Sequence, residues 1–572
     1  MSDCANNFEE LCGNASRAFL QSVVVIDNEA QIETSPSVKR AARAVARSNA
    51  PGGLETPDAD DASRPAASHD SSDIVSSRSD EHRFELDKVA RAFAEKQLTC
   101  GVYLPNDDHP ADSEDLICET FRAIFPTDAC ILDWQLRAGE NEHSIKIIEK
   151  ILEADVESGG RLRLIIIYTA EDVERAEVEL RGYIDENRYG IKEAVDGADV
   201  PLIEGNHFRI VFLKKPTRRD YSDDPAVVHW KHLAERTIEE FTALSKGLLR
   251  AYALQSVAAI RRDMHHILAQ FDPELDTAFA VDRAIKPDPA DAGRLIEEVL
   301  LSELNQAIAR SKQARSCLGK EGVSQWLEFS ESRGVFSDNE HSGKGVKVGN
   351  EKIKKFDRAG RRFLVVDREP GAYKSRDGAI WIADGFYSSP DEAARISAKL
   401  ATLSTISRHR NGLAPLPDDL PRLKLGSVIE KAVRAEATDD SSDQMECYLC
   451  IQPLCDTVRI TSSRSFLMVQ LIRDPDKFQL VLELGSCAQY FRLPKQDERV
   501  LKSVEFPASP NHDSVVARGS GQEELYFVDS SGQKWRWLAD LREMFAVSLG
   551  EQVLVPLGRT GLNSLEWLRL RG

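Results

Sequence analysis

Four polar side chains in the first part of the chain each stand at or just after the end of a short apolar run. They are Asp27, Asp133, Thr169 and Lys215, which follow the runs 23–26, 129–132, 164–168 and 208–213. Asp133 can act as a nucleophile that accepts a phosphoryl group as an acyl phosphate. Lys215 supplies a compact positive charge, and Thr169 supplies a hydroxyl for a phosphoryl oxygen. A hard divalent cation, most simply Mg²⁺, would bridge the phosphoryl oxygens, Asp133 and Asp27. The four residue types together predict a phosphoryl-accepting site.

An alternation of strands and helices can bring these residues together. Strands are predicted at 22–27, 100–104, 130–133, 162–168 and 208–213, and helices at 82–96, 113–125, 143–156 and 171–186. β-Branched or leucine-rich runs separated by helical patterns predict an α/β fold, a doubly wound sheet of five parallel strands. Ligands of such sheets collect at the carboxyl ends of the strands. All four polar residues fall at those ends.

The chain divides into three predicted domains. The α/β domain spans 16–222 and contains an insertion at about 48–80, which is rich in Ala, Ser, Asp, Pro and Gly. We expect this insertion to be disordered, because it has too few large apolar residues to offset the entropy of ordering. Residues 223–333 form a helical segment whose wide apolar stripe predicts packing on the first domain, and dimerisation or relay.

The remainder of the chain is predicted to be an α+β domain at 351–572, after a linker at 332–350 that is polar and rich in glycine. The expected elements are a helix at 390–407, strands at 447–451, 466–472, 478–484 and 524–528, and helices at 535–549 and 562–570. No motif in this domain indicates a particular activity.

Composition excludes several classes of protein. The net charge of −20 argues against general nucleic-acid binding. No apolar run approaches the roughly 20 residues needed to span a bilayer, and the amino terminus lacks the pattern of a secretion signal. Ten cysteines in a chain of 572 residues do not make a disulfide framework. We therefore expect reduced thiols and a cytoplasmic protein.

The order of the four polar residues resembles the receiver domain of response regulators in two-component signalling, over about residues 19–217. The resemblance implies a flavodoxin-like fold, bound Mg²⁺ and a sensor histidine kinase as the phosphate donor. It makes Asp133 the phospho-acceptor, Asp27 a metal ligand, Lys215 the lysine of the family and Thr169 the switch hydroxyl. Phe212 falls where receivers place the aromatic residue that swings inward when the threonine moves.

Three further positions around the site bear on this resemblance. Ala170, directly after the threonine, is small and leaves a phosphoryl group access to the site. Asn28 stands where receivers usually carry a second metal-binding acid, and Arg137 stands where a proline is usual. Asn28 offers the metal a neutral oxygen, so weaker Mg²⁺ binding is predicted, with Glu29 or a water molecule as a substitute ligand.

The large receiver, the helical segment and the long carboxyl-terminal domain together resemble the receiver proteins of Detocs-type anti-phage two-component-like systems. In that family a sensor kinase passes phosphate to receiver proteins, one of which starts an effector response while another acts as a phosphate buffer. The resemblance implies a phosphoryl acceptor without a DNA-binding output, with the buffering role favoured and a second receiver or an effector as a partner. Self-phosphorylation and dephosphorylation of the receiver would then be its only enzymatic steps.

Two other interpretations remain open. The first is a degenerate pseudo-receiver scaffold, in which Asn28 signals lost metal binding and the carboxyl-terminal half binds a partner protein. The second is a receiver-controlled effector with its activity at 352–572.

Three cysteines, Cys447, Cys450 and Cys455, suggest zinc binding or a reactive thiol. A structural zinc site needs four ligands, so Cys487 or a distant histidine would have to complete it. A turn at Cys455 and Asp456 that carries a reactive thiol is a second hypothesis. The third is that the cysteines simply occupy buried strands, where cysteine is common.

Overall fold

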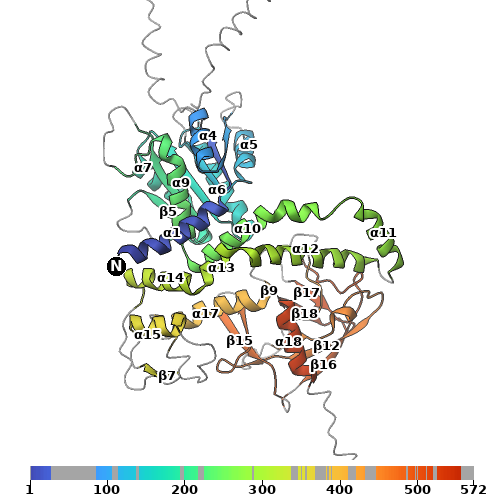
Figure 1. Cartoon of the computed structure of the whole chain (residues 1–572). Coiled ribbons are helices and arrows are strands. Elements are labelled where there is room, and N and C mark those ends of the chain that lie inside the picture. Colours follow the sequence, from blue (N-terminus) through green and yellow to red (C-terminus); the bar gives the residue numbers. More distant parts are fainter. Residues whose placement is uncertain are drawn as a thin grey trace, which may run out of the picture. The chain divides into compact units, whose positions relative to one another are not determined.

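The structure is a computed structural model (Figure 1), and the residues that it describes are 2–27, 86–105, 114–136, 141–192, 199–216, 224–286, 289–336, 346–348, 351–353, 357–367, 382, 386–387, 389–409, 420–431, 446–484, 487–495, 498, 500–510, 512–519 and 525–555. The chain splits into two compact units. The first holds residues 1–156, 160–335 and 358–370, and the second holds 157–159, 336–357 and 371–572. The predicted insertion at 48–80 and the predicted helix at 562–570 lie outside the described residues.

A mixed sheet with six described strands forms the centre of the first unit. The strands are β1 (Ser22–Ile26), β2 (Thr99–Tyr103), β3 (Ala129–Leu132), β4 (Arg163–Thr169), β5 (Leu202–Glu204) and β6 (Phe208–Lys214), in the order β2-β1-β3-β4-β6-β5. Strands β1 to β4 and β6 pair parallel with one another, as in the doubly wound sheet that the sequence predicted.

The prediction of a purely parallel, five-stranded sheet is wrong in one respect, because the sheet also contains the antiparallel strand β5. It pairs antiparallel with β6 at the edge of the sheet. The turn between them is tight: the Gly205 amide donates to the carbonyl of Phe208 at 3.0 Å. A Cβ at Gly205 would lie 2.2 Å from the Phe208 ring, so the turn needs glycine. Three residues are too few for a periodic pattern to be seen in the sequence.

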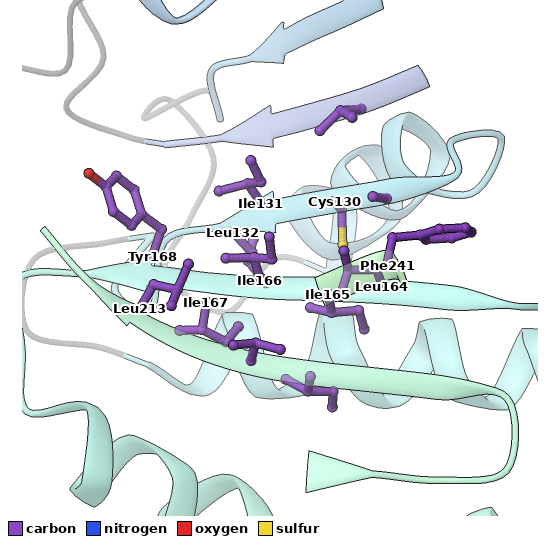
Figure 2. Close-up of a cluster of buried hydrophobic side chains, with 14 of the residues drawn as sticks. Cys130, Ile131, Leu132, Leu164, Ile165, Ile166, Ile167, Tyr168, Leu213 and Phe241 are labelled. Atoms are coloured by element: carbon purple, nitrogen blue, oxygen red, sulfur yellow. The ribbon is translucent and has the colours of Figure 1, made fainter. Parts of the chain in front are cut away.

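Central strands of this sheet are apolar along their whole length because helices cover both faces. Every residue of β3 and β4 is buried. Their side chains pack together in Figure 2, where Cys130, Ile131 and Leu132 lie beside those of 164–167. The helices between the strands are α4 (Leu86–Glu95), α5 (Glu114–Ile124), α6 (Glu142–Glu157), α7 (Val173–Tyr183) and α8 (Glu186–Tyr189).

The hydrophobic core around this sheet also includes side chains from helices that follow residue 222 in the sequence. Helix α9 (Trp230–Ser245) contacts β4 and β6, and α10 (Leu248–Ala269) follows it. The unpredicted helix α1 (Ser2–Phe19) packs on α9 and α10 and buries Phe8, Cys12 and Ala15 in the same core. The unit is completed by α11 (Leu275–Ile285), α12 (Ala290–Arg310), α13 (Lys312–Leu318), α14 (Lys320–Ser332), α15 (Arg358–Arg362) and the π-helical turn η1 (Phe363–Asp367).

The second unit is rich in antiparallel β-structure. Its main sheet, as far as it is described, has the order β16-β12-β11-β10-β18-β17, with β9 also paired to β18. These strands are β9 (Ile406–His409), β10 (Ser427–Lys431), β11 (Cys447–Cys450), β12 (Arg464–Gln470), β16 (Leu501–Phe506), β17 (Tyr526–Val528) and β18 (Lys534–Leu541). The other elements are β7 (Val346–Val348), β8 (Glu351–Ile353), β13 (Ile472–Arg473), β14 (Leu480–Leu484), β15 (Cys487–Arg492), α17 (Pro390–Thr405), the 3-10 helix η2 (Leu454–Asp456) and α18 (Glu543–Leu554).

One predicted element of this unit is wrong. Residues 535–549 were expected to form a helix, but Lys534–Leu541 is strand β18, and the helix α18 begins only at Glu543. Strand β18 is held by β10 on one side and by β17 and β9 on the other. Two of these partners, β9 and β10, are far away in the sequence, so a local pattern could not reveal the pairing. The predicted helix at 390–407 and the predicted strands at 447–451, 466–472 and 478–484 were found close to their expected bounds.

No helix in the described part of the chain is both long and apolar enough to cross a membrane.

Candidate functional site

The carboxyl ends of β1, β3 and β6 bring two acids and one lysine into contact. The Nζ atom of Lys215 donates to Oδ2 of Asp27 at 2.8 Å and to Oδ2 of Asp133 at 2.6 Å. All three residues are buried: Asp27 is 2 %, Asp133 7 % and Lys215 6 % exposed. A single ammonium group therefore holds two carboxylates that lie 106 positions apart in the sequence.

Backbone hydrogen bonds extend the sheet just past its last paired residues and so hold the site. The Asp133 amide donates to the carbonyl of Ile26 at 3.0 Å, which continues the pairing of β3 with β1. The Lys215 amide donates to the carbonyl of Thr169 at 2.7 Å, which continues the pairing of β6 with β4. The hydroxyl of Ser144, in the first turn of α6, donates to the carbonyl of Asp133 at 3.0 Å. The side chains at the site are thus set by the sheet rather than by a free loop.

The electrostatic surroundings of Asp133 bring its pKa closer to neutral pH. Burial raises the pKa of Asp133 to about 6, the charge of Asp27 adds to this, and Lys215 opposes it. Burial disfavours the charge of Lys215, but the two carboxylates outweigh it, so the pKa of Lys215 stands above its usual value. Because one cation faces two acids, the cluster has an excess of negative charge when both acids are ionised. Such a cluster favours a further cation.

Thr169 ends β4 with its side chain buried beside this cluster. It is 1 % exposed, and its Oγ1 accepts a hydrogen bond from the amide of Glu171 at 3.2 Å. Its hydroxyl hydrogen can donate to an incoming oxygen. Ala170, the next residue, is exposed.

Phe212 is fully buried in the core of the sheet. Its ring meets that of Trp134 edge-on, with centroids 6.4 Å apart. Since Trp134 directly follows Asp133, the aromatic residue expected in the switch contacts the neighbour of the expected phospho-acceptor.

Tyr168 is a part of the site that the sequence prediction missed. Its ring centroid lies 5.9 Å from Nζ of Lys215, and its hydroxyl donates to the carbonyl of Val228 at 2.8 Å. Burial and the charges of Asp27 and Asp133 raise the pKa of Tyr168. Figure 2 shows its side chain at the end of β4. An aromatic residue directly before the candidate threonine was the available sequence signal.

The site suits a hard cation such as Mg²⁺. Asp27 and Asp133 present carboxylate oxygens that already converge on one positive charge, and Mg²⁺ is commonly bound through one or two carboxylates together with phosphate oxygens and water. Asn28, the third expected ligand, and Arg137 lie outside the described residues.

The three candidate zinc or thiol cysteines do not converge. Cys447 packs in one hydrophobic cluster with Leu449, whereas Cys450 packs in another with Tyr448, because residues three apart on a strand face opposite sides of the sheet. Burial raises the pKa of both thiols to about 12, which disfavours thiolate chemistry. Cys455 is exposed on η2. The described residues contain no group of three or more potential metal ligands.

Comparison with known protein families bears on the first unit. Residues 19–220 match the family model described as a response receiver domain. A search of the curated proteins gave no match, and a search of the solved structures gave none either. The matched span contains the whole parallel sheet and all the residues of the acid and lysine cluster.

Proposed function

Because residues 19–220 match the family model of a response receiver domain, we propose that Asp133 accepts a phosphoryl group from a phosphohistidine of a sensor histidine kinase. An Asp133 carboxylate oxygen attacks phosphorus, the phosphorus–nitrogen bond breaks, and the leaving imidazole takes up a proton. The product is an aspartyl phosphate. The observation that carries this proposal is the Lys215 ammonium group, which contacts both Asp133 and Asp27 and can neutralise the incoming oxygens.

Asp27 and Asp133 would hold Mg²⁺ at this site, together with Asn28, which directly follows Asp27 in the sequence. The bound ion neutralises charge on the phosphoryl oxygens. Thr169 would donate its hydroxyl to one of these oxygens, and the exposed Ala170 leaves the approach open.

Phosphorylation would add about −1.5 to −2 charges to a cluster that already has an excess of acid. Lys215 and Thr169 are the groups that can compensate by moving, and Phe212 packs against the neighbour of Asp133. We infer that movement of these residues transmits the effect of phosphorylation from the site to the surface of the receiver.

The wider role that we propose is a phosphate buffer in an anti-phage phosphorelay, with a second receiver or an effector as the competing acceptor. Its support is the resemblance in domain organisation, together with a net charge of −20 that disfavours a DNA-binding output. In a mixture of the kinase and the second receiver, the full chain should slow phosphorylation of that receiver. Asp133→Ala should not. Equal slowing by both chains would contradict buffering.

Acceptor function is tested by incubating the full chain with acetyl phosphate and Mg²⁺ and measuring its intact mass. The expected gain is one phosphoryl group, which is absent in Asp133→Ala and absent when Mg²⁺ is chelated. Asp172→Asn is a matched control, since Asp172 is an exposed acid that caps α7 near the same edge of the sheet. It should be phosphorylated as the unchanged chain is.

Two outcomes would contradict the proposal. Phosphorylation retained in Asp133→Ala would place the acceptor elsewhere. No phosphorylation of the unchanged chain by acetyl phosphate or by its kinase would favour a pseudo-receiver scaffold.

A further inference from the structure

A pocket lies within the first unit, between α1, α10, α13 and α14. Its volume is about 380 Å³, within the range of about 300–1,000 Å³ that is usual for small-molecule sites. The most frequent side chain in its lining is the carboxamide, from Asn7, Asn14, Gln255, Gln313 and Gln325. The pocket is therefore lined by groups that each carry both a hydrogen-bond donor and an acceptor.

One of these amides holds a buried polar atom without the partner that burial normally requires, and another belongs to a buried residue. Gln255 lines the pocket and is only 9 % exposed. The Oε1 atom of Gln325 is buried and has no hydrogen-bond partner among the described residues. A buried polar group left unpaired carries a free-energy cost. A ligand that hydrogen-bonds these amides would relieve that cost.

The charges of the lining residues indicate which class of ligand the pocket can bind. Glu10 and Glu321 also line the pocket, and none of its lining residues in the described ranges is a lysine or an arginine. Two acids without a compensating cation disfavour a phosphate or a carboxylate in the ligand. Leu11 and Cys317 contribute to the apolar part of the lining. The chemistry favours an uncharged molecule with several donors and acceptors on one edge.

A nucleobase meets these requirements. Asn and Gln side chains pair with the donor and acceptor edge of adenine through two hydrogen bonds, and acidic side chains accept from exocyclic amino groups. We propose that this pocket binds a nucleobase or a nucleoside that carries no phosphate. Gln255 and Gln325 would make the hydrogen bonds that decide affinity.

The pocket is separate from the phosphoryl-accepting site. It is lined by α1, α10, α13 and α14, whereas the acids and the lysine stand at the ends of strands. Asp133→Ala should therefore bind the same ligand with the same affinity, so failure of one proposal does not affect the other.

The test is isothermal titration of the full chain with adenosine, guanosine, cytidine and uridine, each compared with its 5′-monophosphate. At least one nucleoside should bind, and its monophosphate should bind at least tenfold more weakly. Gln255→Leu and Gln325→Leu keep the size of the side chain but remove its polar atoms, and each should weaken nucleoside binding about tenfold.

Gln270→Leu is the matched control, because Gln270 is exposed at the end of the same helix that carries Gln255. It should bind as the unchanged chain does, and thermal melting checks that every variant is folded. Absence of binding by all four nucleosides at millimolar concentration would overturn the proposal. So would undiminished binding by both Gln255→Leu and Gln325→Leu, or a monophosphate that binds as tightly as its nucleoside.

Discussion

The two ends of the parallel sheet carry buried ion clusters of opposite character. Arg163, at the start of β4, is fully buried and donates from Nε and Nη2 to the two carboxylate oxygens of Asp155, both at 2.8 Å. Its Nη1 donates to the carbonyl of Thr127 at 2.9 Å. At the other end of the sheet, Lys215 contacts two acids with one ammonium group.

The balance of charge in the two clusters distinguishes a structural ion pair from a candidate reactive site. Arg163 and Asp155 neutralise each other, and backbone carbonyls take up further donors of the guanidinium group, so that cluster is satisfied as it stands. The Lys215 cluster has more acid than base, and burial raises the pKa of Asp133 to about 6. Perturbed groups of this kind are typical of functional sites, which agrees with the proposed role of the cluster in binding a metal and accepting a phosphoryl group.

The same substitution at the two acids should therefore have opposite effects on stability. Asp155→Asn leaves a buried arginine without its counter-charge, and breaking such a pair costs about 3 kcal/mol or more. We expect a clear fall in the free energy of unfolding, measured by urea denaturation of the full chain. An unchanged stability would mean that the Arg163 cluster is not structural.

Asp133→Asn is expected to stabilise the protein in the absence of Mg²⁺. It removes the excess negative charge, and a pKa raised from 3.8 to about 6 corresponds to on the order of 3 kcal/mol at neutral pH. Urea denaturation at pH 7.5 with a chelator measures this gain. A loss of stability would show that Asp133 is needed to hold Lys215 in place.

The gain from Asp133→Asn should depend on pH with a definite sign. Since the folded-state pKa of Asp133 is raised, its contribution to stability is fully present below about pH 4 and is lost as pH rises through 6. The variant and the unchanged chain should be equally stable near pH 4, diverge between pH 4 and 6, and differ by a constant amount above that. Thermal melts across this range give the curve. A constant difference at all pH values would contradict the raised pKa.

Tyr168→Phe is expected to have the smallest effect. It removes the hydroxyl that donates to the Val228 carbonyl, a loss of about 1 kcal/mol, but keeps an aromatic ring near Lys215. Phosphorylation by acetyl phosphate should continue in this variant while the melting temperature falls by a few degrees. Loss of phosphorylation in a folded variant would instead make the hydroxyl part of the reactive site.

Much of the receiver could be predicted from sequence because its signals are local. Apolar strands such as Leu164–Ile167 are buried on both faces and can be seen directly. The edge strand Leu202–Glu204 was too short to show a pattern, and the helix Ser2–Phe19 was not predicted. Strand Lys534–Leu541 was mistaken for a helix because its pairing partners, not its own pattern, make it a strand.

By itself, the sequence determined which residue types end the parallel strands, and from these the acid, hydroxyl and lysine chemistry of the site. Tertiary structure alone decided that Lys215 contacts both Asp27 and Asp133, that Tyr168 reaches Val228, and that Cys447 and Cys450 face opposite sides of a sheet. The physical reason is that residue type and periodicity are local properties of the chain. Contacts between strand ends depend instead on strand order and register, which the burial of the whole core selects.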